Sequence, residues 1–418
     1  MSLDVTAAAS ILRETYPKGI VEIDYSRAKT LALLKKGRGT LVEGDFGTAF
    51  KQPIKYGGPQ AGSSSYTIGY AQAATENSRY THWYLTPSEL FQFARVSGAI
   101  IRRSQGPGAF VRALVSEIEN AKLSLTRFVE QYLDGDGFGA LGTISSISTV
   151  TVTMTYPWMV RFFEIGMSIC ASSANSTAVL KAPTIGKYTK ITARSVSAGT
   201  LTTADDMSSG GTPWAANDFL FRYGDRADSA SATMQVPCGF AGFLPDTDAA
   251  RSTSFFNVNQ TLTERLGGLR ATANGSIEEA ILDMSADIDS QGGQTTHAVM
   301  GSKTFTKLGK SLLNKVYADV VDADNMKIGV QGIVIQGASG DILCYGDSAF
   351  KEGRIRLFDL ADIGILHTQD DLVKLEQMDG LQFRQIDGTD DWMARIVASY
   401  QFHLDAPGHA GTITGITV

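Results

Sequence analysis

A glycine-punctuated aromatic segment over residues 46–85 constrains this chain most, because it predicts strands with no core of their own. Aromatic and apolar residues alternate with other residues in two runs, as in half-buried strands: Phe50, Ile54 and Tyr56, then Tyr66, Ile68 and Tyr70. Gly-Gly-Pro and Gly-Ser-Ser-Ser lie between the runs and predict a long hairpin with a flexible tip near residues 57–65. An isolated hairpin is marginally stable. We therefore expect a neighbouring chain to cover it.

The clearest helix is predicted over residues 109–133. One apolar stripe follows the 3/4 spacing of a helix, and its members are Phe110, Leu114, Ile118, Ala121, Leu125, Phe128 and Tyr132. At ~1.5 Å per residue such a helix is roughly 37 Å long. The sequence Asp134-Gly-Asp-Gly137 follows it and resembles a fragment of a calcium loop, but the other ligands are absent, so a helix-ending turn is favoured. The helix is expected to be a structural spine.

Residues 1–45 form a polar arm with little core of its own. Seven Lys/Arg and four Asp/Glu between Met1 and Thr40 give it a net charge of +3. Short helices are predicted over residues 7–14 and 25–36, and a further helix over 89–95 after Pro87. These pieces would need a partner surface in order to be stable.

The rest of the chain is rich in predicted strands. Strands are expected at 149–155, 161–169, 190–196, 200–204 and 219–223, and those within 161–225 would form a small β-barrel-like insert. Helices are predicted over 277–290, with Ser276 as N-cap, and over 302–313. A short buried strand is expected at 297–300. Later strands would form one closing sheet: 333–335, 341–345, 355–359, 364–367, 381–385 and 394–402.

Length and composition limit the possible classes of protein. A chain of 418 residues is too long for one ordinary core, so two or three domains or lobes are expected. The formal charge of −6 argues against a basic nucleic-acid-binding surface over the whole chain. The three cysteines are far apart, which disfavours a disulfide framework or structural zinc and fits a reducing cytoplasm. Neither a signal peptide nor a run of 18 apolar residues is present, so no membrane span is expected.

Sequence patterns that carry catalysis are missing. The five histidines lack HxxxH or HExxH spacing, and there is no P-loop, no GxSxG elbow and no dinucleotide-binding glycine motif. Paired acid/base catalysis by loop carboxylates stays open, although solvated turns are favoured. The candidate pairs are Asp205-Asp206, Asp246 with Asp248, and Asp390-Asp391. We therefore expect no catalytic, cofactor-binding or metal-binding residues and no enzymatic activity.

The order of these parts resembles the major capsid proteins of tailed bacteriophages, whose architecture is often called the Johnson fold. Three stretches also look like this family: 162–167 with 217–225, then 266–269 with 275–280 and 292–300, and finally 328–344 with 397–408. The resemblance implies an α+β fold with an N-arm, an E-loop hairpin, a P domain with a long spine helix, an A domain and the β insert. Its expected bounds are 1–45 for the N-arm, 46–86 for the E-loop, 87–155 for the P domain, 156–340 for the A domain, and 341–418 for the closing sheet of the P domain.

The resemblance also implies a function. The chain would self-assemble into hexamers and pentamers of an icosahedral phage head that encloses double-stranded DNA. Its partners would be further copies of itself, with portal, scaffolding and decoration proteins as further candidates and non-specific contact with the packaged DNA. Assembly would take place in the host bacterial cytoplasm, and the final location would be the virion capsid.

Inter-subunit contacts are expected at the hairpin and just before the long helix. The candidate residues are Lys51, Lys55, Tyr56, Gly57, Gly58, Pro59, Arg102 and Arg103. A lysine of the E-loop is cross-linked to a neighbour's asparagine in some relatives, but no acceptor is identifiable here. Two alternatives remain. One is an encapsulin-type cellular shell protein, which usually lacks a β insert of this size, and the other is a β-rich enzyme whose site is not recognisable in sequence.

Overall fold

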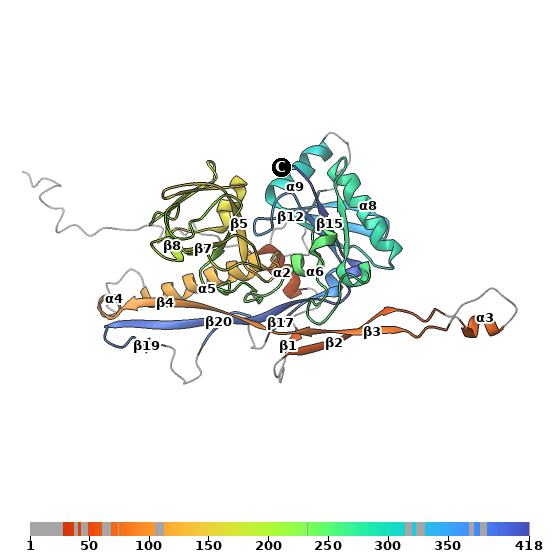
Figure 1. Cartoon of the computed structure of the whole chain (residues 1–418), viewed down its shortest axis with the longest axis horizontal. Coiled ribbons are helices and arrows are strands. Elements are labelled where there is room, and N and C mark those ends of the chain that lie inside the picture. Colours follow the sequence, from red (N-terminus) through yellow and green to blue (C-terminus); the bar gives the residue numbers. More distant parts are fainter. Residues whose placement is uncertain are drawn as a thin grey trace, which may run out of the picture.

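A computed structural model describes residues 28–36, 41–42, 49–60, 68–73, 75–104, 113–231, 233–313, 320–322, 331–367, 372–376 and 383–417. Helices and strands build four parts: an elongated six-stranded sheet, a two-stranded hairpin, a closed barrel and a seven-stranded sheet (Figure 1). The mixture of helices and sheets confirms the expected α+β class. The predicted helix over residues 7–14 lies outside the described residues. No helix in the described parts is long and apolar enough to cross a membrane.

The elongated sheet is built around its longest strand, β20 (Asp391–Leu404). Strand β4 (Ser88–Ser97) pairs antiparallel along one side of β20, and β17 (Ile363–His367), β18 (Lys374–Leu375) and β19 (Arg384–Gln385) pair along it as well. Strand β1 (Leu41–Val42) extends β17 in parallel. Helix α5 (Ala113–Tyr132), which confirms the predicted spine over most of its length, packs on β4 and β20.

The predicted helix over residues 89–95 is wrong, because this segment lies within β4. Leu90, Ala94 and Val96 are buried, whereas Phe91 and Phe93 are exposed. This alternation has the period of a strand. Ten residues of β4 pair with β20, about 300 positions later in the chain. Such long-range pairing overrides the local helix signal.

The predicted hairpin is confirmed as β2 (Phe50–Gly57) paired antiparallel with β3 (Arg79–Leu85). The expected second run of the hairpin, at Tyr66, Ile68 and Tyr70, is not a strand. Helix α3 (Ile68–Ala73) occupies part of it, and Tyr66 lies outside the described residues. At the base of the hairpin, Trp83 is fully buried and meets Phe243 and Phe255 edge to face.

The barrel consists of six short strands in the closed order β10-β5-β6-β9-β8-β7. Their bounds are Ala140–Ser148 for β5, Thr151–Met154 for β6, Ser168–Ser172 for β7, Tyr188–Ser195 for β8, Thr200–Thr203 for β9 and Phe219–Arg222 for β10. The barrel is therefore confirmed, but its expected start at residue 161 is wrong, because β5 and β6 belong to it rather than to a P domain ending at 155. The expected strand over 161–169 is instead the 3-10 helix η1 (Pro157–Phe162) followed by a turn before β7.

The seven-stranded sheet has the order β11-β21-β16-β12-β15-β14-β13. The bounds are Leu269–Thr272 for β11, His297–Gly301 for β12, Val320–Asp322 for β13, Gln331–Gly337 for β14, Gly340–Asp347 for β15, Ile355–Phe358 for β16 and Gly411–Thr414 for β21. Helices α8 (Ile277–Ser290) and α9 (Ser302–Leu313) pack against it and match the predictions. Ser276 caps α8 in a capping box with Glu279.

The expected single closing sheet, and with it the boundary at residue 341, is wrong. Strands β14, β15, β16 and β21 belong to the seven-stranded sheet, whereas β17, β19 and β20 belong to the elongated sheet. The chain passes between the two sheets at η3 (Leu360–Asp362) and returns through η4 (Pro407–His409). Alternation within a strand indicates which residues face a core, but it does not indicate which sheet the strand joins.

Part of the N-terminal arm packs on its own subunit. Helix α2 (Lys29–Lys36), which lies within the predicted helix over 25–36, buries Leu31, Leu33 and Leu34 against the core that it shares with β17. The remaining short elements complete the described chain: α4 (Gly98–Ser104), α6 (Phe240–Phe243), η2 (Asp248–Ala250) and α7 (Glu264–Gly267).

Replacing Trp83 with alanine tests how the base of the hairpin is held. Trp83 is fully buried, so its truncation should lower the free energy of unfolding by about 3–5 kcal/mol, as for other buried aromatic residues. Chemical denaturation of the full chain measures this change. Tyr80→Ala is the matched control in the same strand, because Tyr80 is 67% exposed and its loss should leave the stability nearly unchanged. Equal effects of both substitutions would contradict the described packing.

Candidate inter-subunit surfaces and the buried polar junction

The hairpin contacts its own subunit along β2 and β3, but it also carries exposed side chains. Near the base Tyr84 N donates to Phe256 O at 3.0 Å, and near the outer end of β2 Arg265 Nη1 donates to Tyr56 O at 3.3 Å. Tyr80, which lies opposite Lys55, is 67% exposed, and Ile68 of α3, beyond the paired strands, is 73% exposed. Figure 1 shows that α3 and the outer ends of β2 and β3 project beyond the rest of the molecule. The outer hairpin thus presents apolar side chains with no core from its own subunit.

The predicted hairpin residues lie along this projection. The ammonium groups of Lys51 and Lys55 are exposed and stand 5.6 Å and 6.0 Å from the ring centres of Tyr84 and Tyr80. Cation–π pairs at exposed sites are weak, so these lysines can exchange partners at little cost. Gly57 packs on the Arg79 side chain, whereas the space around the Gly58 Cα is open and Pro59 is exposed.

The other predicted contact residues lie at the opposite end of the elongated sheet. Arg102 of α4 forms an exposed ion pair with Asp390 at 2.7 Å, and this pair holds the pKa of Asp390 below its usual value. The Arg103 side chain lies outside the part of the chain that the structure describes. Figure 1 shows α4 and α3 at opposite ends of the molecule. The predicted residues therefore form two separate surfaces and not one site.

A third exposed surface follows the outer face of β4. Phe91 and Phe93 are 47% and 49% exposed, and the Arg395 guanidinium lies 5.9 Å from the Phe93 ring centre. Among the strands that the structure describes, β4 pairs with β20 alone. Exposed aromatic side chains on an edge strand favour contact with another chain.

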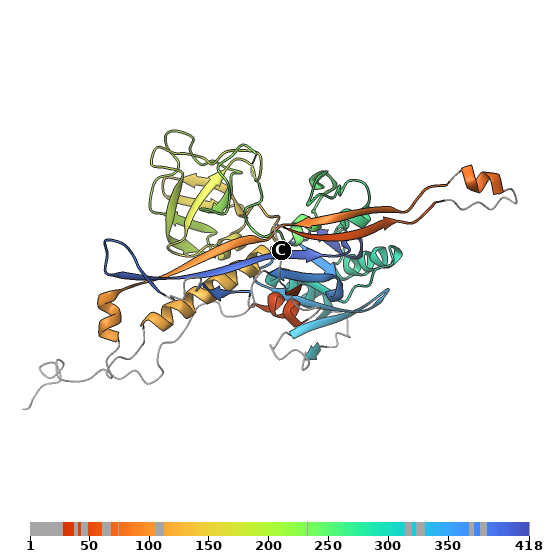
Figure 2. The ribbon, with the colours of Figure 1, turned by 90° about the horizontal axis from the view of Figure 1, so that it is seen from below.

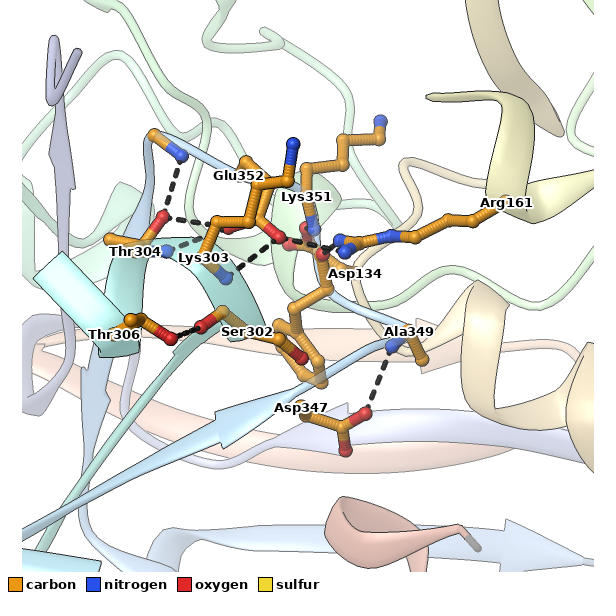
Figure 3. Close-up of polar contacts among 12 residues, drawn as sticks. Asp134, Arg161, Ser302, Lys303, Thr304, Thr306, Asp347, Ala349, Lys351 and Glu352 are labelled. Carbon is orange, nitrogen blue, oxygen red and sulfur yellow. Dashed lines mark hydrogen bonds and ion pairs between the residues drawn. The ribbon is translucent and has the colours of Figure 1, made fainter. Parts of the chain in front are cut away.

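A buried polar junction joins the barrel, helix α5 and the seven-stranded sheet, which together form the body of the molecule. The turn between β15 and β16 is the centre of this junction (Figure 3). The Glu352 side chain, which is fully buried, accepts from Lys303 N at 3.1 Å and from Thr304 N at 2.9 Å. These amides open α9, so the carboxylate lies at the positive end of the helix dipole. Glu352 also pairs with Arg161 of η1 at 2.7 Å, which connects the seven-stranded sheet to the barrel.

Arg356 of β16 makes the second connection. Its Nε donates to Asp134 at 3.1 Å, just beyond the end of α5, and its Nη1 donates to Leu244 O at 2.9 Å. Asp246 lies 3.2 Å from Nη2. Burial opposes the charge of Arg356, but Asp134 and Asp246 outweigh it and raise its pKa. Asp134, which the sequence placed in a helix-ending turn, is thus an ion-pair partner in the body, and Asp246 is not a solvated loop carboxylate.

Asp347 makes the third connection, to the arm. Its Oδ2 accepts from Thr30 N at 3.1 Å and from Thr30 Oγ1 at 2.5 Å, while Oδ1 accepts from Ala349 N at 2.9 Å. Thr30 lies at the start of α2 and is fully buried. Ten consecutive residues, 347–356, therefore hold α2, α5, α9 and the barrel in place.

The barrel has a second attachment through Glu164. This carboxylate pairs with Arg127 of α5 and, at 3.0 Å, with Arg194 of β8. Arg127 Nη2 also donates to Arg161 O at 2.7 Å. The Arg161 guanidinium lies 5.7 Å and 5.4 Å from the ring centres of Trp158 and Phe162. The Glu352 cluster thus connects the barrel to α9, and the Glu164 cluster connects it to α5.

These arrangements stabilise and position elements, and they do not resemble a catalytic site. Within the described ranges, no group of three or more His, Cys, Asp or Glu side chains could hold a metal ion. The sequence patterns did not single out Glu352 or Arg356. One signal was available, because Arg356 interrupts the apolar strand Ile355–Phe358, and a charge in a fully buried strand requires a partner.

Replacing Glu352 with alanine tests the junction. Removing one member of a buried ion pair leaves Arg161 and the α9 amides without their acceptor, so we expect a loss of about 3–5 kcal/mol in stability. Asp391→Ala is the control, because it breaks an exposed ion pair, 2.5 Å from Arg95, and should change the stability little. Denaturant titration of the unassembled chain compares the two. A similar small effect for both would show that the junction is not a main support of the body.

Comparison with known proteins gives the fold. No protein-family model and no curated protein matches the sequence. Among solved structures, a chain of the cyanophage A-1(L) capsid asymmetric unit matches with a TM-score of 0.57 and 12% identity, over 98% of both chains. A chain of the capsid of a native GTA particle matches with a TM-score of 0.50 and 11% identity, over 100% of this chain and 99% of that chain. The resemblance seen in the sequence is therefore confirmed at the level of architecture: this chain has the fold of phage capsid proteins.

Proposed function

We propose that the chain is the major shell subunit of a tailed-phage head, which self-assembles into hexamers and pentamers around double-stranded DNA. The observation that carries this proposal is the hairpin β2–β3, which is anchored by Trp83 and projects beyond the body with Ile68 and Tyr80 exposed. A projection of this kind is stable when it lies on another copy. The capsid fold supports the same conclusion.

The proposed domains follow from the observed sheets. Residues 1–45 would be the N-arm, and 46–86 the E-loop. The P domain would consist of α4, α5 and the elongated sheet, and the A domain of the seven-stranded sheet with α8 and α9. The barrel, from β5 to β10, would be the insert. Figure 2 shows the barrel and the seven-stranded sheet as separate bodies beside the long strands β4 and β20.

In the proposed shell, rigid and adaptable parts have different roles. The junction of Glu352 and Arg356 would keep the shape of every subunit the same. The hairpin, with the exposed Lys51 and Lys55, would adjust to hexamer and pentamer positions, as a closed shell of one chain requires. Many weak contacts add up when they form together. The proposed role is structural, with no catalysis.

The proposed partners are further copies of the chain, together with portal, scaffolding and decoration proteins. Contact with packaged DNA would be non-specific and sensitive to salt. The proposed site of assembly is the cytoplasm of the bacterial host, and the mature location is the virion. The six-stranded barrel supports a phage shell over a cellular encapsulin, which the resemblance expects to lack an insert of this size.

A hairpin deletion tests this proposal. Replacing residues 58–75 with a two-residue turn removes α3 but retains Trp83 and all of β2 and β3. We expect the subunit to keep its unfolding midpoint but to lose at least tenfold in the yield of assembled particles, as measured by light scattering after size-exclusion chromatography. Tyr188→Ala, which removes an exposed aromatic residue on the barrel, serves as a control that should assemble. Normal assembly of the deletion variant would contradict the proposed role of the hairpin.

A further inference from the structure

A cleft of about 460 Å³ lies between the barrel and the seven-stranded sheet. One wall comes from the start of β5 and the residues around η1, and the other from the turn 351–354 and the segment after β21. The residues that matter for its chemistry are Tyr156, Trp158, Lys351 and Arg354. The cleft adjoins the ion pair between Arg161 and Glu352, so an occupant would touch both bodies that this pair connects.

Lys351 gives the cleft a positive charge without a direct ion pair to a described carboxylate. No carboxylate among the described residues lies within 4 Å of its ammonium group, although Asp134, Asp136 and Asp246 surround it at longer range. Asp134 and Asp246 already pair with Arg356, and Asp136 accepts from the Asn175 amide. Figure 3 shows the Lys351 side chain extending away from Asp134 and Glu352. Burial and the neighbouring Arg354 lower the pKa of Lys351, so its charge is one that an added anion would stabilise.

An aromatic surface lies beside this charge. Tyr156 is 54% exposed and stacks on Trp158 with 5.9 Å between ring centres. Trp158 is held in turn by an edge contact with Phe162 and by the Arg161 guanidinium. The exposed face of Tyr156 is therefore held in a fixed position and can accept a flat or apolar group.

We propose that this cleft binds an acidic peptide segment of a partner protein, with one carboxylate at Lys351 and a neighbouring aromatic side chain against Tyr156. The volume is within the range of ligand pockets and suits two or three side chains rather than a whole helix. A carboxylate fits better than a phosphate, because phosphate sites usually offer several free donors. Here Arg354 is already paired with Asp246 at 2.7 Å.

Peptide binding can be measured on the unassembled full chain, so the result does not depend on whether the chain forms a shell. The probes are dye-labelled peptides Phe-Asp-Phe and Phe-Asn-Phe, blocked at both ends, and their binding is followed by fluorescence anisotropy. We expect the aspartate peptide to bind at least about tenfold more tightly, which corresponds to roughly 1.4 kcal/mol for one charged contact. Equal affinity of the two peptides would overturn the proposal.

Two substitutions locate the binding. Lys351→Met keeps the aliphatic stem and should abolish the preference for aspartate, while Tyr156→Ala should weaken both peptides. Lys187→Met, which alters a lysine already paired with Asp228 on the barrel, should leave binding unchanged. Thermal unfolding checks that each variant is folded, and Lys351→Met should unfold at the same or a higher temperature because it removes a desolvated charge. Full binding by Lys351→Met, or displacement of the peptide by an equal concentration of inorganic phosphate, would contradict the proposed site.

Discussion

The arrangement of the barrel, helix α5 and the seven-stranded sheet depends on two buried charges, one in the turn between β15 and β16 and one in β16 itself. Glu352 and Arg356 are almost fully buried, and each would destabilise the fold without its partners. Arg161, Asp134 and the amides that open α9 are therefore required in fixed positions. Because these partners belong to the barrel, the end of the long helix and the seven-stranded sheet, one network determines how all three bodies are arranged. Apolar packing alone is less specific about orientation.

Because the body is rigid, the parts of the subunit that can adapt to different neighbours are the hairpin and the opposite end of the elongated sheet. The hairpin is attached through Trp83, but exposed side chains of β2 and β3 make weak contacts, such as those of Lys51 and Lys55 with tyrosine rings. At the opposite end of the elongated sheet, exposed ion pairs join Arg102 to Asp390 and Arg95 to Asp391. Such contacts can be exchanged for contacts with a neighbour at little free-energy cost. This division between a rigid body and adjustable ends suits a subunit that occupies slightly different positions in one shell.

The sequence predicted those elements that are determined by neighbouring residues, such as an apolar stripe at helical spacing or an N-cap. Helix α8 follows from its apolar stripe and the Ser276 cap, and α5 from its 3/4 spacing. Strand β4 was mistaken for a helix because its identity depends on pairing with β20, far along the chain. The start of the barrel was placed too late because β5, with three serines and one glycine among its nine residues, gives a weak strand signal. The division of the last strands between two sheets has no local signal. The junction was missed for the same reason, since Glu352 meets Arg161 across 191 positions.

Electron cryomicroscopy of the unmodified full chain after expression and purification is the most direct test of the account. The account predicts closed particles built of hexamers and pentamers, in which β2 and β3 lie across a neighbouring subunit and the barrel keeps its orientation relative to α5. A stable monomer in solution, or particles in which the hairpin folds back on its own body, would contradict it.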